Sequence, residues 1–137
     1  MEVVAEGSGT VILDRERRIL LILRKNSRTF NETWSNPGGG ALEGETQEQT
    51  AIRETFEEIG VETRVIRKIA DHYHYNERSE LMGVFGGFLV EIVRGTPYIK
   101  EPNKIERLDY FTRRDVPSNL ADFTRTYINS LTQEEFP

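Results

Sequence analysis

Residues 38–61 read GGGALEGETQEQTAIRETFEEIGV, and this stretch contains the clearest helix signals in the chain. Thr46 is followed three residues later by Gln49, which is the spacing of a capping box. Gly60 stands where helices commonly end in a left-handed conformation. Together these signals predict a helix that runs from about residue 47 to residue 59.

The predicted helix has two unlike faces. At about 100° per residue, four residues share the side that we expect to pack against a core: Ile52, Thr55, Phe56 and Ile59. Three carboxylates gather on the opposite side: Glu54, Glu57 and Glu58. Like charges at these spacings destabilise a helix by roughly a few tenths of a kcal/mol per pair, so a compensating partner is expected.

The acidic cluster has two interpretations. It is either an ordinary solvated face or a site for a hard cation such as Mg²⁺ or Mn²⁺, which prefers carboxylate oxygens. The glycine-rich segment directly before the helix favours the cation site, because its backbone carbonyls can approach closely. Arg53 beside Glu54 is suited to grip a carboxylate or a phosphate, although a surface ion pair is the plainer alternative.

On the N-terminal side, residues 10–13 and 18–23 are apolar runs separated by a polar turn. They predict a β-hairpin whose second strand is apolar on both faces and therefore central in a sheet. A loop and a short strand should follow, up to Asn36. Pro37 and the glycines at 38–40 are expected to stop regular structure.

On the C-terminal side, three strands are predicted, over residues 65–75, 81–93 and 105–111, with a bulge at Gly86 and Gly87. Apolar residues then recur at helical spacing: Leu120, Phe123, Tyr127 and Leu131. Ser118 or Asn119 is available to cap this second helix. Strands and helices in this order predict an α/β fold with a mixed β-sheet covered on both faces.

Composition excludes several classes of protein. A chain of 137 residues is the size of one domain, and it has no cysteine for a disulfide or a thiolate metal site. Its net charge of -5 argues against broad binding to long nucleic acids. It has neither an apolar run long enough to cross a membrane nor a signal-like start, so a cytoplasmic location is expected.

The spacing from Gly39 onward resembles the signature of the Nudix hydrolases. Gly39 is followed after five residues by Glu45, and after seven more by Arg53 and Glu54. The segment then reads TFEEIGV over residues 55–61, which places two glutamates, a glycine and an aliphatic residue as the signature does. Thr55 departs from the pattern, which prefers an aliphatic residue there. We expect its methyl to pack while its hydroxyl bonds back to the helix.

This resemblance implies a single Nudix domain over residues 1–137, with the α/β/α sandwich of that family and a mixed sheet. It implies a dependence on Mg²⁺ or Mn²⁺ and hydrolysis of a nucleoside diphosphate linked to another group. Metal would be held by three glutamates and one glycine carbonyl: Glu54, Glu57, Glu58, and Gly39 or Gly38. Glu45 and Arg53 would hold the loop and the helix together.

Attack of water on a diphosphate requires that its negative charge is neutralised and that a base removes a proton. Family members differ in whether the base lies on the signature helix or in a distal loop. Glu101 is the distal candidate, because it opens a late segment that resembles the family, although an ordinary exposed glutamate is an equal alternative. Glu54 is the candidate on the helix.

Substrate recognition is less clearly encoded. Arg24 and Lys25 end the second strand, where a cation can meet a phosphate, and Asn119 can bind a base edge if it is not a helix cap. Phe30 and Trp34 could stack on a base, but core packing is the stronger interpretation. A nucleoside triphosphate, canonical or oxidised, is the leading substrate.

The chain has two histidines, which alternate on a predicted strand. His72 and His74 share one strand face but lack a third nitrogen or sulfur ligand, so we expect ordinary strand residues. A catalytically silent nucleotide-binding or regulatory module is disfavoured because the proposed metal-binding carboxylates are all present. A structural protein with an acidic helix does not explain the spacing of Gly39, Arg53 and Gly60.

Overall fold

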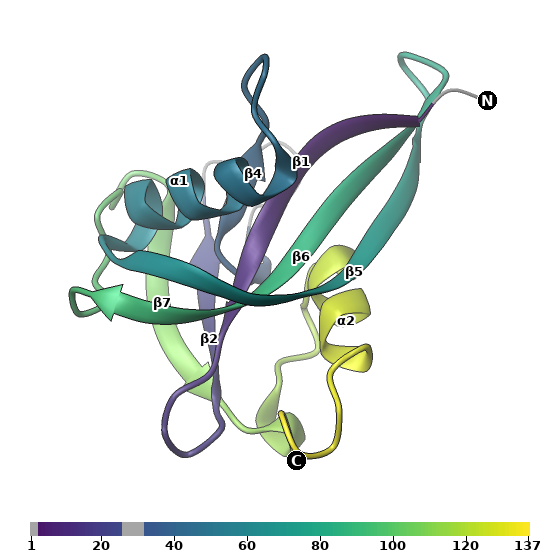
Figure 1. The fold of residues 1–137 in the computed structure, drawn as a ribbon. Helices are drawn as coiled ribbons and strands as arrows, with labels where there is room; N and C mark the ends of the chain where they lie inside the picture. The colour runs from purple at the N-terminus through teal and green to yellow at the C-terminus, as the bar shows by residue number, and fades with distance from the viewer. Residues whose placement is uncertain (1–2, 26–31) are drawn as a thin grey trace.

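The structure is a computed structural model, and it describes residues 3–25 and 32–137 (Figure 1). Its elements follow one another along the chain as β1 (Val3–Ile12), β2 (Ile19–Arg24), β3 (Trp34–Ser35), β4 (Gly38–Gly40), α1 (Gln47–Ile59), β5 (Glu62–Asn76), β6 (Leu81–Arg94), β7 (Ile105–Phe111), a short 3-10 helix η1 (Arg113–Asp115) and α2 (Asp122–Asn129). The helix over 47–59 and the strand over 105–111 have the predicted bounds.

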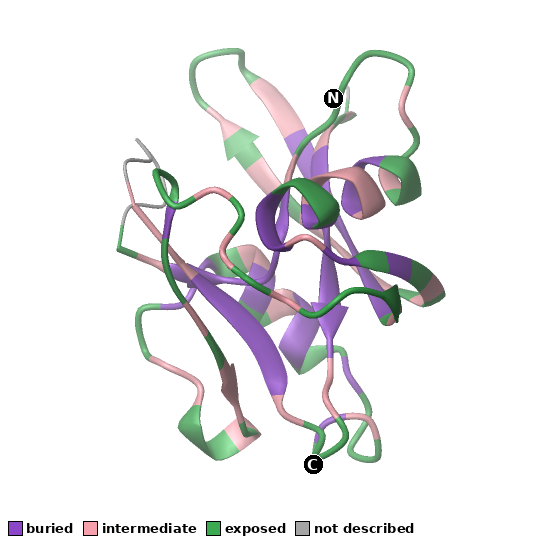
Figure 2. Cartoon of the chain, turned by 90° about the vertical axis from the view of Figure 1, so that its left-hand side faces the viewer, coloured by how far each residue is buried: buried purple, intermediate pink, exposed green. Residues whose placement is uncertain are grey.

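Two sheets form the centre of the molecule. One has the strand order β4-β1-β6-β5, in which only the β1–β6 pair is parallel, so this sheet is mixed. The other is the antiparallel sheet β3-β2-β7. The helices α1 and α2 contribute to two separate apolar clusters with the strands between them (Figure 2). This arrangement confirms the predicted α/β class with helices on both faces.

Strand β2 contributes to both clusters. Ile19 and Leu21 pack in the cluster of α2, whereas Leu20 and Ile22 pack in the cluster of α1. All four side chains are fully buried, and β2 is the middle strand of its sheet. The unbroken apolar run therefore does mark a central strand, because alternate side chains of a strand point to opposite faces.

The predicted hairpin of the first two strands is wrong. β1 pairs with β4 and β6, whereas β2 pairs with β3 and β7, so the two strands lie in different sheets. The segments that join them meet through a bridge between Leu13 and Ile19 and a bond from the Asp14 N–H to the Arg18 carbonyl. The turn is as expected, but each strand finds its partners elsewhere in the chain.

The glycines at 38–40 do not stop regular structure, as the sequence suggested, but form strand β4 against β1. A Cβ on Gly9 would lie 2.4 Å from the Pro37 carbonyl oxygen, and one on Gly7 would lie 2.3 Å from the Gly39 carbonyl oxygen. The absence of side chains lets the two strands approach this closely. It therefore brings residues 38–40 within reach of α1.

The bulge expected at Gly86 and Gly87 is present in the β5–β6 ladder opposite Gly87, but its extra residue lies on β5, between Lys68 and Ala70. The two glycines instead make room for both helices. A Cβ on Gly86 would meet the Gln47 side chain of α1 at 2.7 Å, and one on Gly87 would meet the Tyr127 ring of α2 at 2.4 Å. Both helices therefore sit tightly on β6.

The cap of α2 differs from the prediction. Its N-cap is Ala121, without a side-chain hydrogen bond, so neither Ser118 nor Asn119 caps the helix. The segment before α2 is held instead by the backbone, through bonds that link Trp34 to Asn119 and to Ala121. Within the described residues, no helix is long and apolar enough to cross a membrane.

Candidate functional site

Helix α1 begins and ends on the predicted signals. The Thr46 hydroxyl accepts the Gln49 N–H at 3.1 Å, and the Gln49 side chain accepts the Thr46 N–H at 2.9 Å. Gly60 has a φ of 71° and donates its N–H to the Phe56 carbonyl at 2.9 Å. The helix is thus fixed at both ends by its own local sequence.

The buried face of α1 differs from the predicted one. Phe56 is 42% exposed and lies under the Lys100 ammonium, which is 3.8 Å from the ring centre. Glu58, expected on the solvent side, is only 3% exposed. The face that packs on the sheet therefore contains a carboxylate in place of a phenyl ring.

Thr55 is fully buried at the centre of this face. Its hydroxyl lies 2.7 Å from the hydroxyl of Thr10 on β1, which is also fully buried. The expected bond back to the helix is therefore replaced by a bond across to the sheet. A hydroxyl at a position where the family prefers an aliphatic residue is thus matched by a second hydroxyl.

Glu58 joins three segments of the site. Its carboxylate accepts the backbone N–H of Gly38 at 2.7 Å and pairs with the Arg24 guanidinium at 2.8 Å. Burial raises the pKa of Glu58, and the nearby charge of Glu54 adds to this effect, whereas Arg24 and the Gly38 N–H oppose it. The site therefore holds two mutually repelling carboxylates close together.

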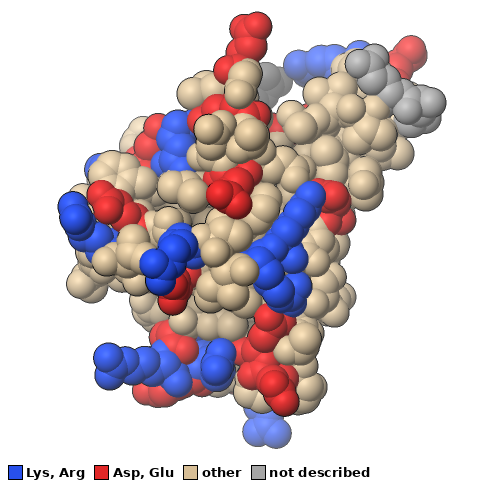
Figure 3. Space-filling view, viewed as in Figure 1, with Lys and Arg blue, Asp and Glu red and all other residues tan. Residues whose placement is uncertain are grey.

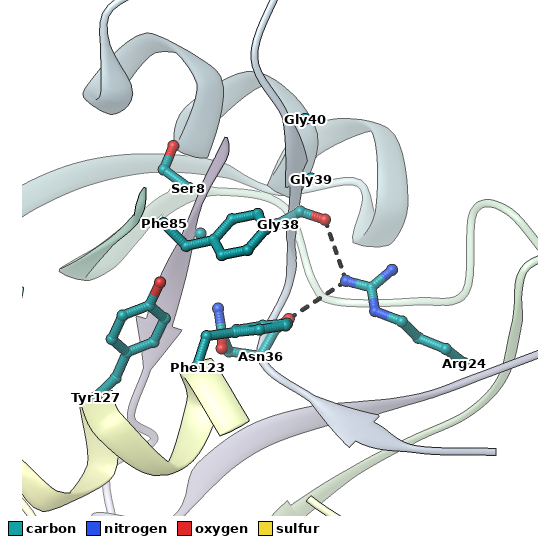
Figure 4. A pocket seen from close by; sticks show the side chains of 10 residues that line it. Ser8, Arg24, Asn36, Gly38, Gly39, Gly40, Phe85, Phe123 and Tyr127 are labelled. Atoms are coloured by element: carbon teal, nitrogen blue, oxygen red, sulfur yellow. Dashed lines mark hydrogen bonds between the residues drawn. The ribbon is translucent and has the colours of Figure 1, made fainter. Parts of the chain in front are cut away.

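Arg24, expected to meet a phosphate, is occupied within the site. Besides Glu58, it donates to the Ser35 hydroxyl at 2.7 Å. It also donates to the Gly38 carbonyl at 3.1 Å and to the Asn36 carbonyl at 3.4 Å (Figure 4). Its side chain is only 14% exposed. Arg24 also borders a pocket, so its positive charge faces both the carboxylate and that space.

Arg53 ties the loop before α1 to the helix. It bonds both oxygens of Glu45, at 2.7 and 2.9 Å, and the Gly40 carbonyl at 2.9 Å. It also reaches Glu54 at 2.8 Å and Glu57 at 3.2 Å. The bonds from Arg53 lower the pKa of Glu45 to about 2, so this carboxylate is ionised at neutral pH.

Glu54 lies directly against Gly39. A Cβ on Gly39 would be 2.4 Å from a carboxylate oxygen of Glu54, so only a glycine leaves room for this contact. Glu54 is 18% exposed and Glu57 is 47% exposed, which leaves both accessible from solvent. The exposure of the three glutamates thus increases from Glu58, which is buried at the sheet, through Glu54 to Glu57, which lies at the surface.

A pocket of about 150 Å³ lies beside strand β4 (Figure 4). Its lining combines glycine backbone, one cation and aromatic rings: Ser8, Gly9, Arg24, Asn36, Gly38, Gly39, Gly40, Phe85, Phe123 and Tyr127. Sequence reasoning assigned no role at the site to Asn36 or Phe85, and it placed Tyr127 only in the second helix. These residues meet through sheet pairing, which leaves no local signal in the sequence.

The chain matches a known family along nearly its whole length: the family model for the NUDIX domain matches residues 5–131. The chain belongs to the Nudix family. The Nudix chain is 33% identical over 143 residues to an RNA pyrophosphohydrolase of Bartonella bacilliformis, with 88% of this chain and 84% of that protein covered. It is 31% identical over 81 residues to a putative 8-oxo-dGTP diphosphatase of Bacillus subtilis, with 59% and 52% covered.

Solved structures agree on the Nudix fold. A MutT Nudix hydrolase from Burkholderia pseudomallei has a TM-score of 0.83 and 28% identity, and 96% of this chain and 100% of that chain are covered. A MutT protein from Methanosarcina mazei has a TM-score of 0.77 at 18% identity, with 94% of each chain covered, which is a likeness of fold alone. The chain is also 34% identical over 83 residues to an RNA pyrophosphohydrolase of Sphingopyxis alaskensis. This match covers 58% of this chain but only 51% of that protein.

The carboxylate oxygens on the Nudix helix are the type of ligand that a hard divalent cation prefers. Within the part of the chain that the structure describes, however, no three His, Cys, Asp or Glu side chains are grouped closely enough to hold a metal ion. The carboxylates of Glu54 and Glu58 are instead bonded to Arg53 and Arg24. Mg²⁺ commonly uses one or two carboxylates together with water and substrate phosphates, so a preformed cage of three is not required.

The remaining predicted residues lie around this centre. Glu101 follows Lys100, whose N–H bonds the Glu58 carbonyl at 3.0 Å, so Glu101 lies beside the last turn of α1. Its carboxylate is 3.6 Å from the Lys104 ammonium. Asn119 donates to the Glu32 carbonyl at 2.9 Å and does not line the pocket beside β4.

The aromatic and histidine predictions also have defined places. Trp34 is 8% exposed and packs edge-on against Phe111, which is the core role that the sequence favoured. Phe30 lies outside the described residues. His72 meets the Thr126 hydroxyl at 2.8 Å, and His74 pairs with Glu6 at 3.0 Å, so the two histidines have different partners.

Proposed function

We propose that this Nudix protein is a metal-dependent pyrophosphohydrolase that cleaves a diphosphate linkage of a nucleoside triphosphate, or another nucleoside diphosphate derivative, by attack of water at phosphorus. The observation that supports this most is the junction of α1 with β4. There, Glu58 bonds the Gly38 N–H and Glu54 lies against Gly39, so carboxylates and bare backbone converge at one end of a pocket.

The cofactor in this proposal is Mg²⁺ or Mn²⁺, held by Glu54, Glu57 and Glu58 with help from the Gly39 carbonyl. These are hard oxygen donors, as such ions prefer, and two of them are already close enough to repel each other. A bound divalent cation neutralises phosphate oxygens and makes water more acidic. It would also relieve the repulsion between Glu54 and Glu58.

The other residues then have distinct roles. Arg53 holds Glu54 and Glu57 in place through its bonds to the loop, because Glu45 and Gly40 fix the opposite side of its guanidinium. Arg24, which borders the pocket, would bind a phosphate at its edge. The base that takes the proton from water is either Glu54, on the signature helix, or Glu101, beside the last turn of that helix.

Small nucleotides are the substrates that this site fits best. One relative is named putative 8-oxo-dGTP diphosphatase, after a small nucleotide, whereas the other is named RNA pyrophosphohydrolase, after RNA. The net charge of this chain is -5, and acidic and basic side chains are interspersed over the face in Figure 3. Such a surface favours a small nucleotide over extended phosphate-driven contact with a long nucleic acid.

A catalytically silent nucleotide-binding module is the alternative function. It would keep the pocket and the phosphate-facing Arg24 without turnover. This alternative is less well supported, because the proposed ligands Glu58 and Glu54 both lie against the glycine strand. Hydrolysis itself separates the two functions.

The test is a screen of the protein with Mg²⁺ and with Mn²⁺ against ribonucleoside triphosphates, 8-oxo-dGTP and a 5′-triphosphorylated oligoribonucleotide. Products are identified by mass, and the reaction is run in H₂¹⁸O to locate the attacked phosphorus. The proposal expects one ¹⁸O atom on a product phosphate and turnover of at least one small nucleotide. Binding of nucleotides without any product would favour the silent module.

A further inference from the structure

The lining of the pocket beside β4 has two chemically different parts. The polar part is Gly38, Gly39 and the cation of Arg24. The aromatic end is formed by the rings of Phe85 and Phe123, whose centres are 5.5 Å apart. A ligand with phosphates against the polar part can therefore place its organic part against these rings.

Tyr127 supplies an unused polar group at this aromatic end. Its side chain is 1% exposed, and its hydroxyl has no hydrogen-bond partner among the described residues. In Figure 4 this hydroxyl points into the space next to Ser8 and Phe85. Burial raises the pKa of Tyr127, so the group is a neutral O–H that can donate or accept a hydrogen bond.

An orphaned hydroxyl in a pocket wall is costly to the free protein unless something binds to it. The ring of Tyr127 is needed for packing, because it fits against Gly87 in the core cluster of α2. A phenylalanine would fill the same space without the cost. The oxygen is therefore available to a polar group that enters the pocket.

The size and walls of the pocket select a flat ring. Its volume of about 150 Å³ is well below the roughly 300–1,000 Å³ of pockets that take whole drug-sized ligands, so it admits one ring system. Phe85 is held in place by His74, which stacks on it with ring centres 4.9 Å apart. Fixed aromatic rings are favourable stacking partners for nucleobases.

Asn36 adds a second fixed polar group to the lining. Thr124 accepts the Asn36 backbone N–H at 3.1 Å and donates to its side-chain oxygen at 2.6 Å. The side-chain nitrogen donates to the Pro37 carbonyl at 2.9 Å, which uses one of its two hydrogens. The amide is thus rigid, with one donor beyond its internal bonds.

We propose that this pocket holds the nucleobase of the substrate and that the Tyr127 hydroxyl, by hydrogen bonding to a polar group on the edge of the base, determines specificity. The inference rests on the proposed function, since it assigns the base end of the same substrate. It concerns binding rather than the chemical step. Tyr127 should therefore affect the affinity for the substrate and the choice of base.

The experiment compares the parent protein, Tyr127→Phe and the control Tyr110→Phe, a partly buried tyrosine that borders a different cavity. Titration calorimetry with Mg²⁺ measures the Kd of the α,β-methylene analogues of ATP, GTP, CTP and UTP, and of tripolyphosphate, which has no base. For the tightest of the four analogues, Tyr127→Phe should raise the Kd by about three- to tenfold, the value of one net hydrogen bond. Tripolyphosphate binding should not change.

Three results would overturn the inference. They are an unchanged Kd for every analogue in Tyr127→Phe, an equal loss for the analogues and tripolyphosphate, or a parent that binds tripolyphosphate as tightly as any nucleotide. Thermal unfolding provides the control for folding, and Tyr127→Phe should be at least as stable as the parent because the orphaned oxygen is gone. Failure of the proposed function looks different, since nucleotides would then bind with base preference but would not be hydrolysed.

Discussion

The backbone nitrogen of Gly38 donates a 2.7 Å hydrogen bond to the carboxylate of Glu58, twenty residues further along the chain. This bond holds strand β4 against helix α1. The guanidinium of Arg24, at the end of β2, pairs with the same carboxylate. The three segments that form the proposed metal and phosphate site therefore meet at one buried carboxylate.

Glu58 should accordingly contribute to stability, unlike its neighbour Glu57. At pH 8, we expect Glu58→Gln to lower the free energy of unfolding by about 3 kcal/mol, because it leaves Arg24 buried without its counter-charge. Glu57→Gln should change it by no more than about 0.5 kcal/mol, because Glu57 is 47% exposed. Urea unfolding measures both, and equal stabilities would contradict this role of Glu58.

Gly39 should be required for the position of Glu54. In Gly39→Ala, the new methyl would occupy the place of the Glu54 carboxylate, which can move because it is the end of a flexible side chain. We expect a folded protein whose turnover falls by about 100-fold, as for a misplaced group in an active site. Gly40→Ala is the matched control, since its methyl would lie 3.7 Å from the nearest atom. Similar turnover in both variants would argue against a role for the Gly39–Glu54 contact.

The two buried hydroxyls of Thr10 and Thr55 should behave as a pair. Thr55→Val leaves the Thr10 hydroxyl without its partner and should cost about 1–3 kcal/mol of stability. The double variant Thr10→Val/Thr55→Val removes both polar groups and should recover most of that loss. Chemical unfolding of the parent, of both single variants, Thr10→Val and Thr55→Val, and of the double variant gives the coupling free energy. Simple additivity of the single changes would show that the hydroxyls do not interact.

Glu135, in the C-terminal segment, should make the stability of the protein depend on pH in the acid range. Two hydrogen bonds from Arg67 lower the pKa of Glu135 from 4.5 to about 2. The carboxylate is therefore ionised more readily in the folded than in the unfolded protein, and its stabilisation is complete above about pH 4.5. It should be lost as the pH falls from there through about 2.

The measurement is the Tm of the parent and of Glu135→Gln between neutral pH and about pH 2.5. At neutral pH the parent should be more stable by up to about 1 kcal/mol, because the pair is partly exposed. The difference should shrink as the pH falls. A difference that stays constant across this range would contradict the assigned pKa shift.

The sequence predicted the elements whose signals are local. The bounds of α1 were correct because the capping box of Thr46 and Gln49 and the left-handed Gly60 all act within a few residues of the helix ends. The buried face of α1 was not predicted, because the partners that pull Glu58 inward, Arg24 and Gly38, come from other strands. An apolar pattern alone therefore selected Phe56 for the core.

Pairing between distant strands accounts for the other differences. Residues 38–40 form a strand because β1 offers an edge with the glycines Gly7 and Gly9, which the glycine run itself does not reveal. The carboxylates of the site could be predicted from their spacing on one helix. The aromatic pocket could not, since Phe85 and Tyr127 lie 42 residues apart in the chain and meet only after folding.

The most direct test of the central proposal is the turnover of the best nucleotide found in the screen, measured with and without divalent cations. Excess chelator should abolish hydrolysis, and added Mg²⁺ or Mn²⁺ should restore it. The side chain of Glu57 is exposed, so Glu57→Gln should not disturb folding. This variant should lower turnover by about two to three orders of magnitude at saturating metal. Full activity of the parent in excess chelator would contradict the account.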